Sequence, residues 1–150
     1  IMKFSENEMS EFHRKKIGFV FQKFNLLPML NVRENIVLPL TLGGETVDDE
    51  YIDELIQFLG LRQREKHLPG ELSGGQQQRV SIGRALATKA EVLLADEPTG
   101  NLDQNTSYEI MEYFRNLNKK YGKTIIMITH DMNLAQNADE IIQIVDGRII

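Results

Sequence analysis

The sequence contains no cysteine, so it has no disulfide framework and no metal site built on thiolates. It also lacks any apolar run close to the roughly 20 residues that a membrane-spanning helix needs. Its longest apolar runs, such as Ile36 to Leu40, fall far short of that length, and nothing in it is typical of a signal peptide. If the protein works at a membrane, we expect a partner to supply the membrane-spanning part.

An excess of positive charge is absent as well. The 17 Lys and Arg residues are outnumbered by 22 Asp and Glu residues, which gives a net charge of -5 and an isoelectric point near 5.2. Apart from the cluster Arg14 to Lys16, the basic side chains are dispersed along the chain. Because nucleic-acid binding depends on clustered cations that neutralise phosphates, we expect no nucleic acid among the partners.

The chain of 150 residues, with 41% apolar content, is long enough for one domain with its own core. Three apolar runs predict buried strands, and the run in the middle is expected to be buried on both faces of a parallel sheet. The runs are Ile17 to Phe21, Glu91 to Ala95 and Thr124 to Thr129. A helical pattern separates the last two runs, so they form a βαβ unit with a right-handed crossover, and the fold class is α/β.

Apolar residues at helical spacing predict the helices. We expect five helices: Asn31 to Leu38, stopped by Pro39; Asp49 to Leu59, with Gly60 as its stop; Gly75 to Lys89; Gln104 to Tyr121, stopped by Gly122; and a short one from Asn133 to Asn137. The chain begins with a surface segment from Ile1 to Lys16, which has Met2, Phe4, Met9 and Phe12 on one face. Gly43 and Gly44 predict a flexible joint, and Arg62 to Gly70 predicts a charged linker. A strand from Glu140 to Val145 is expected to turn at Asp146 and Gly147 into a hairpin with Arg148 to Ile150.

The stretch Leu72 to Arg79 describes a loop that leads into a helix. Ser73 and Gln76 have the spacing of a capping box, in which the hydroxyl accepts a hydrogen bond from a first-turn N–H. Gly74 and Gly75 carry no side chain, so a ligand can approach the backbone. The exposed amides and the helix dipole then favour a phosphate, whereas an ordinary capped helix is the alternative interpretation.

Polar residues follow all three predicted strands: Gln22, Asp96 with Glu97, and His130 with Asp131. Ligands of open parallel sheets bind beyond the carboxyl ends of the strands, so we expect these side chains to converge in one crevice. Taken singly, each has an ordinary explanation as a loop contact, a helix cap or a structural histidine. Their occurrence at three corresponding strand ends favours a shared site.

Such a set of side chains suits phosphoryl transfer from a magnesium nucleotide to water. Asp96 can ligate Mg²⁺ or its waters, and Glu97 can orient and deprotonate the attacking water. Gln22 can bind both metal and water, because its amide has a donor and an acceptor, and His130 can donate to a γ-phosphate. No His or Cys residues have the spacing of a zinc site, so we expect no bound zinc.

Five motifs in this order resemble those of ATP-binding-cassette ATPases. They are Gln22 after an apolar strand (the Q-loop), Leu72 to Gln76 (the signature), Glu91 to Glu97 (Walker B), Gly100 to Asp103 (the D-loop) and Ile128 to Asp131 (the H-switch). The resemblance covers Ile17 to Ile150. Three stretches are most similar to the exporter branch that includes the lipoprotein-releasing, macrolide-export and antimicrobial-peptide-resistance ATPases: Phe19 to Pro28, Gln76 to Gln78 and Ala95 to Asp103.

This resemblance implies a P-loop NTPase fold, with a RecA-like parallel sheet core that is incomplete here and an inserted α-helical subdomain. The nucleotide-binding core would cover residues 1–23 and 79–150, and the helical subdomain with the signature would cover residues 24–78. The resemblance also implies ATP and Mg²⁺ as cofactors. Glu97, His130 and Gln22 would act in hydrolysis, and Asp96 and Gln22 would lie at the metal.

Cassettes of this family pair head to tail. The resemblance therefore places Ser73, Gly74, Gly75 and Gln76 against the γ-phosphate of an ATP that a second ATPase subunit mainly holds. Asp103 would lie at the seam between the two subunits.

A second implied partner is an integral membrane permease. The segment Phe24 to Pro28 lies where related cassettes receive a coupling helix of the permease, and that contact would explain exposed side chains at Leu26 and Leu27. Simple core packing is the alternative for the two leucines. The cassette is then expected to be cytoplasmic and peripheral to the inner face of the cell membrane.

One motif of the family is absent. A Walker A loop, G-x-x-x-x-G-K-[S/T], precedes the Q-loop in such cassettes, and none of the 11 glycines fits it. Gly70 and Gly75 have the right spacing, but Gln76 and Gln77 occupy the Lys and hydroxyl positions. No adenine-stacking aromatic can be identified ahead of it either. We interpret the sequence as a fragment without its first strands, its Walker A loop and a short C-terminal tail.

Two other functions deserve comparison. Chromosome-maintenance and DNA-repair ATPases also carry the signature, but that type inserts a long coiled coil, whereas only 51 positions and no heptad pattern separate Gln22 from Ser73. A non-catalytic module that only donates a signature loop to a partner stays open. The sequence does not identify the transported substrate, because the resemblance implies that the permease selects it.

We predict that the 150-residue chain on its own shows no Mg²⁺-dependent ATP hydrolysis, because the P-loop amides and lysine carry most of the triphosphate contacts. Phosphate release from ATP, measured with and without Mg²⁺, tests this prediction, with a complete cassette as positive control. Turnover by the chain that depends on Mg²⁺ would contradict it.

Overall fold

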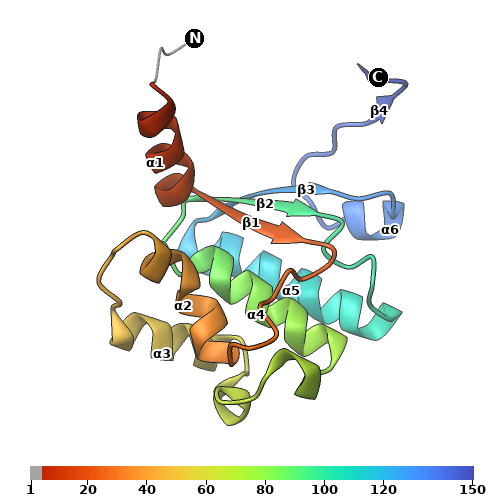
Figure 1. Cartoon of the computed structure of the whole chain (residues 1–150). Coiled ribbons are helices and arrows are strands. Elements are labelled where there is room, and N and C mark those ends of the chain that lie inside the picture. The colour runs from red at the N-terminus through yellow and green to blue at the C-terminus, as the bar shows by residue number, and fades with distance from the viewer. Residues whose placement is uncertain (1–4) are drawn as a thin grey trace.

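Three parallel strands form the sheet around which the chain is arranged (Figure 1). The computed structural model describes residues 5–150, so Met2 and Phe4 lie outside the described residues. The strands are β1 (Ile17–Phe21), β2 (Val92–Asp96) and β3 (Thr124–Ile128), and they pair in the order β1-β2-β3. The three predicted strands and the parallel βαβ arrangement are confirmed.

Helices α4 (Gly74–Leu86) and α5 (Gln104–Tyr121) lie against one face of this sheet (Figure 1). The strand residues on that face, among them Val20, Leu93 and Ala95, are buried. The opposite face is apolar but open among the described residues: Phe19 is 44% exposed and Ile126 is 54% exposed. Complete burial of the middle strand is therefore a wrong prediction, since β2 alternates between buried and half-buried residues.

The segment between β1 and α4 folds into α2 (Val32–Leu42), α3 (Asp49–Phe58) and two single 3₁₀ turns, η1 (Arg62–Arg64) and η2 (Pro69–Glu71). Contrary to the prediction, α2 does not stop at Pro39 but continues to Leu42. Leu40, just beyond the proline, is buried, and the N–H of Gly43 donates to the carbonyl of Pro39. Burial and the helix-end bond thus outweigh the one hydrogen bond that a proline removes.

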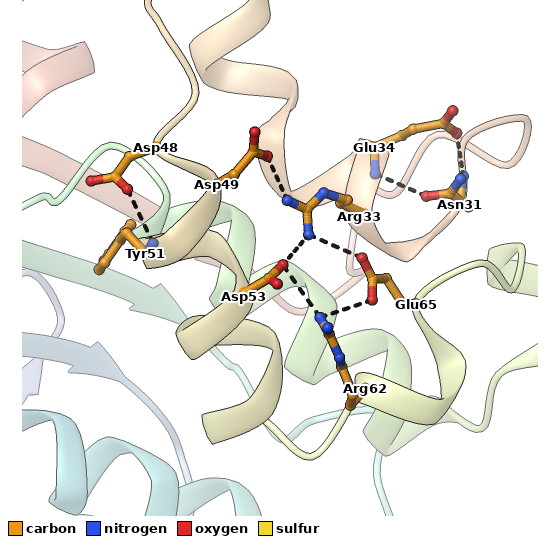
Figure 2. Close-up of polar contacts among 9 residues, drawn as sticks. All are labelled: Asn31, Arg33, Glu34, Asp48, Asp49, Tyr51, Asp53, Arg62 and Glu65. Carbon is orange, nitrogen blue, oxygen red and sulfur yellow. Dashed lines mark hydrogen bonds and ion pairs between the residues drawn. The ribbon is translucent and has the colours of Figure 1, made fainter.

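A network of charged side chains joins α2 to α3 and η1 (Figure 2). Arg33 of α2 contacts Asp49 at 2.6 Å, Asp53 at 2.5 Å and Glu65 at 3.0 Å, and Arg62 contacts both Asp53 and Glu65. The hydrogen bonds from Arg33 and then from Arg62 lower the pKa of the Asp53 carboxyl. The network fixes the angle between the two helices through a charge cluster rather than through apolar contacts alone.

The two long helices, α4 and α5, end in different ways. α5 ends at Gly122, which has a φ of 62°, so the predicted stop is confirmed. α4 ends at Leu86 and not at Lys89, because Lys89 itself adopts a left-handed conformation with a φ of 57°. At this helix end the carbonyl of Leu86 accepts from the hydroxyl of Tyr51 at 2.9 Å and from the N–H of Lys89 at 2.8 Å.

The outer segments follow the prediction only in part. The expected surface helix is α1 (Glu6–Lys16), and Phe12 on it is 43% exposed. The short helix after β3 is α6 (Met132–Ala135), and the hairpin consists of β4 (Ile144–Val145) and β5 (Arg148–Ile149). Residues 140–143 of the expected strand lie on an exposed segment before β4, where the N–H of Ile150 donates to the carbonyl of Gln143 at 3.1 Å, so the strand is shorter than predicted.

The length and apolar content of the helices show whether any of them could span a membrane. Among residues 5–150, no helix is long and apolar enough to cross a bilayer.

Candidate functional site

The register of the sheet brings the carboxyl ends of the three strands level with one another. Phe21 of β1 lies opposite Asp96 of β2, and Asp96 lies opposite Ile128 of β3. The residues that follow these positions, Gln22 and Glu97, therefore leave the sheet at the same edge, with His130 close behind. The convergence predicted from the three strand ends is present in the structure.

Gln22 is held against the loop that follows β2. The side-chain amide of Asn101 donates to the backbone carbonyl of Gln22 at 2.9 Å. Gly100 lies so close that a Cβ there would stand 2.5 Å from Nε2 of Gln22. A glycine at position 100 thus leaves room for the Gln22 side chain, and the bond from Asn101 holds the Gln22 backbone.

Asp96 presents an open carboxylate at the end of β2. It is exposed and has no hydrogen-bond or ion-pair partner among residues 5–150. No group of three His, Cys, Asp or Glu side chains in this part of the chain could by itself hold a metal ion. A single free carboxylate is the donor set that suits Mg²⁺, which keeps several waters and is bound by one or two carboxylates together with phosphates.

Glu97 turns away from Asp96 and toward the end of β3. Its backbone N–H donates to the carbonyl of Ile128 at 2.9 Å, and its φ of 44° lies in the left-handed region, which is unusual for a residue with a side chain. Its Oε1 accepts from the backbone N–H of His130 at 3.0 Å and lies 2.7 Å from Nδ1 of the same residue. The hydroxyl of Thr129 donates to Oε2 at 3.4 Å. Strained backbone at such a place is typical of functional sites.

His130 and Glu97 form one coupled pair. The Glu97 side chain is only 21% exposed, whereas the imidazole is 84% exposed. The hydrogen bond that His130 donates to Glu97, and then the negative charge of Glu97, raise the pKa of His130 above its usual value. The open imidazole therefore keeps a proton to higher pH than a free histidine, with one nitrogen committed to Glu97 and the other facing outward.

The predicted capping box is present at the start of α4. Oγ of Ser73 accepts from the N–H of Gln76 at 3.3 Å, and Oε1 of Gln76 accepts from the N–H of Ser73 at 2.9 Å. Ser73 is exposed. The helix thus starts on an open surface with the positive end of its dipole outward, as anion binding requires.

The two glycines of the signature also serve packing. A Cβ on Gly75 would stand 2.4 Å from Cγ2 of Thr106, and one on Gly74 would stand 3.3 Å from Cδ2 of Leu102. The first turn of α4 therefore approaches the first turn of α5 too closely for a side chain at position 75. Asp103, which caps α5, accepts from the hydroxyl of Thr106 at 2.6 Å, and this bond lowers the pKa of its carboxyl.

Other residues with structural roles around the site were not predicted. Gln78, fully buried on α4, donates to the carbonyl of Pro98 at 2.7 Å and so connects α4 to the residue after Glu97. Asn35, fully buried on α2, accepts from the N–H of Leu27 and donates to three carbonyls of the loop before α2. Asn101 lies within the D-loop motif, but a single sequence does not show what its side chain contacts.

The structure thus forms two groups of predicted residues. Gln22, Asp96, Glu97 and His130 share the carboxyl edge of the sheet, whereas Ser73, Gly74, Gly75, Gln76 and Asp103 share the amino-terminal ends of α4 and α5. No hydrogen bond or ion pair within residues 5–150 joins the first group to Ser73 or Gln76. Leu102 and the ring of Phe24 lie between them, next to Gly74.

Comparison with known proteins relates this arrangement to one family. A family model described as "ABC transporter" matches residues 2–100. The chain is 47% identical over 148 residues to the "Macrolide export ATP-binding/permease protein MacB" of Mannheimia succiniciproducens, over 97% of this chain and 23% of the relative. It is 44% identical to an "Uncharacterized ABC transporter ATP-binding protein" of Thermotoga maritima, over 99% of this chain and 64% of the relative.

Solved structures agree with these sequence matches. The dimeric structure of MJ0796, described as a bacterial ABC transporter cassette, aligns with a TM-score of 0.83 at 42% identity and covers 97% of this chain and 66% of that one. A dimeric post-hydrolysis state of the same cassette, bound to ADP and Pi, aligns with a TM-score of 0.82 at 41% identity and covers 98% of this chain. The chain spans about a quarter of the MacB relative and just under two thirds of the cassettes.

We predict that Glu97→Gln lowers the pKa of His130 toward the value of a free histidine, because both the hydrogen bond and the charge that favour the imidazolium are weakened. An NMR titration of the His130 imidazole measures this directly. Asp131→Asn is the matched control, since Asp131 makes the smallest contribution to the shift and its removal should lower the pKa less. An unchanged titration of His130 in Glu97→Gln would contradict the pairing.

Proposed function

This chain belongs to the ABC transporter family and has the fold of its ATPase cassette, and we propose that it forms the ATP-hydrolysing part of an exporter. The exporter assignment follows from the macrolide-export relatives, of which the chain covers about a quarter. The observation that carries the proposal is the shared carboxyl edge of the sheet. A free carboxylate, an amide and a carboxylate–imidazole pair meet there at the ends of three strands in register.

The metal site in this proposal consists of Asp96 and Gln22. Within residues 5–150 the carboxylate of Asp96 has no hydrogen-bond or ion-pair partner, and the side-chain amide of Gln22 lies against Gly100 at the neighbouring strand end, where Asn101 holds the backbone carbonyl of Gln22. Together they would hold Mg²⁺, which when bound neutralises negative charge on the phosphates of ATP.

Glu97 is the proposed base for the attacking water. Its carboxylate is fixed by Thr129 and by the backbone N–H of His130, so it can hold a water in one orientation. His130 shares the same oxygen of Glu97, and its second nitrogen faces outward as a donor for the γ-phosphate. The pair therefore supplies both an acceptor for the water proton and a cation near the departing phosphate.

The signature loop is proposed to complete the site of a second copy. Ser73 and the free amides of α4 lie on an exposed surface, apart from the strand ends of the same chain. Both solved relatives are dimeric cassettes, which supports a paired arrangement. In a head-to-tail pair, Ser73 to Gln76 would contact the γ-phosphate held by the partner, and Asp103 would lie at the seam.

A permease is the second proposed partner, which would place the cassette at the cytoplasmic face of the membrane. The name of the MacB relative includes a permease. On the segment after Gln22, Leu27 is 40% exposed and nearby Met29 is 76% exposed, whereas Leu26 packs against the core. The expectation of two exposed leucines is thus wrong for Leu26, and the proposed contact with a coupling helix rests on Leu27 and Met29.

The proposed division of the cassette into two parts is the one that the family resemblance implies. Residues 24–78 would form the helical subdomain, and residues 1–23 and 79–150 the nucleotide-binding core. α4 belongs to both, because it begins at the signature and packs along α2 and β1. The segment between Gln22 and Ser73 consists of α2, α3 and two short turns and contains no coiled coil, so nothing favours a chromosome-maintenance role.

We predict that Glu97→Gln, in the complete encoded protein, abolishes ATP turnover and favours an ATP-bound dimer, because the amide cannot accept the proton of the attacking water. Phosphate release and size-exclusion chromatography with ATP measure the two effects. Glu112→Gln is the matched control, since Glu112 is exposed on α5 and, within residues 5–150, pairs with Arg115 alone.

Unchanged turnover in Glu97→Gln would remove Glu97 from the role of base and leave His130 as the candidate. Loss of turnover in Glu112→Gln would show that the effect reflects charge or folding in general rather than the position of Glu97.

A further inference from the structure

We propose that Arg84, on α4, is a positioning residue for Gln22: it holds the loop after Gln22 in its conformation and ties that loop to the signature helix. The proposal rests on the proposed function, because it assigns Arg84 an effect on hydrolysis that acts through Gln22. Nothing in the sequence points to this role, since Arg84 lies 62 positions after Gln22.

The loop after Gln22 has an unusual backbone. Phe24 has a φ of 40° and Asn25 a φ of 51°, so two consecutive residues with side chains are in the left-handed region. Such conformations persist only where the surroundings enforce them, and an aromatic residue is a poor choice for one. The loop therefore needs an external contact that holds it.

Arg84 supplies this contact with both arms of its guanidinium. Nη2 donates to the carbonyl of Phe24 at 2.8 Å, and Nη1 donates to the carbonyl of Asn25 at 2.6 Å. The planar fork thus binds the two carbonyls of the strained pair at once. Arg84 has no carboxylate partner among residues 5–150, and burial lowers its pKa, so this cation is placed for the two carbonyls and not for an ion pair.

The same loop touches the beginning of α4. The ring of Phe24 lies with Cζ 3.8 Å from the position that a Cβ on Gly74 would take. Arg84 comes eleven residues after Ser73, which is about three helical turns, so the two lie on the same side of α4. Long side chains lean toward the amino-terminal end of their helix, which lets Arg84 reach back toward the signature.

Gln22 is therefore held from two directions. Asn101 binds its carbonyl from the loop after β2, and Arg84 binds the carbonyls two and three residues further along. Because the Gln22 side chain lies against Gly100, a shift of this short segment at either end would change that contact. Release of the Arg84 end would let the backbone relax from the left-handed region and move Gln22.

The test compares Arg84→Lys with Tyr51→Phe in the complete protein. Lysine keeps the charge and stem of Arg84 but cannot bind both carbonyls, whereas Tyr51→Phe removes one hydrogen bond between a side chain and a carbonyl of α4 far from Gln22. We expect Arg84→Lys to lower kcat about tenfold, as the loss of one charged hydrogen bond can, to leave KM for ATP unchanged, and to lower the unfolding midpoint no more than Tyr51→Phe does. Tyr51→Phe should leave kcat unchanged.

A double-mutant cycle with Gln22→Ala shows whether Arg84 acts through Gln22. We expect Arg84→Lys to cause no further loss of kcat in the Gln22→Ala background. An equal loss in both backgrounds, or an unchanged kcat in Arg84→Lys alone, would overturn the positioning role while the proposed function stands. If Gln22→Ala itself leaves kcat unchanged, the proposed role of Gln22 fails, and the positioning role fails with it.

A second measurement does not depend on turnover. The 150 residues contain no cysteine, so Lys23→Cys adds one attachment point on the loop for a nitroxide label, and in the complete protein any cysteine outside these residues is first replaced by serine. We expect the label to become more mobile when Arg84→Lys is added, and a label at Asn116→Cys on α5 to stay unchanged. Equal mobility at position 23 with and without Arg84→Lys would overturn the proposal.

Discussion

The in-register parallel pairing of β1, β2 and β3 is the constraint on which the candidate site depends. Because Phe21, Asp96 and Ile128 lie at one level, the chain turns out of the sheet at one edge in all three strands. A shift of one residue in the pairing of β3 with β2 would turn every side chain of β3 to the other face and separate His130 from Glu97, and the same shift of β1 would displace Gln22. The contact between Glu97 and His130 thus depends on the register of the strands more than on local sequence.

Helix α4 connects this edge to the rest of the cassette. It begins at the capped Ser73, sends Gln78 to the carbonyl after Glu97 and Arg84 to the loop after Gln22, and packs along β1 through Gly18. Side chains of one rigid helix therefore contact both loops that carry catalytic candidates.

Much of the fold was predictable because it follows from short-range patterns. The three strands, the capping box of Ser73 and the stop at Gly122 follow from apolar runs, helix caps and glycine conformation, and all are confirmed, with strand ends that differ by at most one residue. The course of α2 beyond Pro39 was not, because tertiary burial of Leu40 outweighed a local rule. Contacts such as that of Arg84 join segments far apart in the chain, and no periodicity in one sequence can reveal them.

The central claim is that one copy's strand-end residues and another copy's signature loop make a single site, and mixing two inactive variants of the complete protein tests it most directly. Ser73→Arg blocks the donated loop, and Glu97→Gln removes the proposed base. A head-to-tail pair of one Ser73→Arg copy and one Glu97→Gln copy contains one site with both residues intact. The account predicts that the mixture regains ATP turnover that neither variant shows alone. No turnover in the mixture, with mixed dimers shown to form, would contradict it.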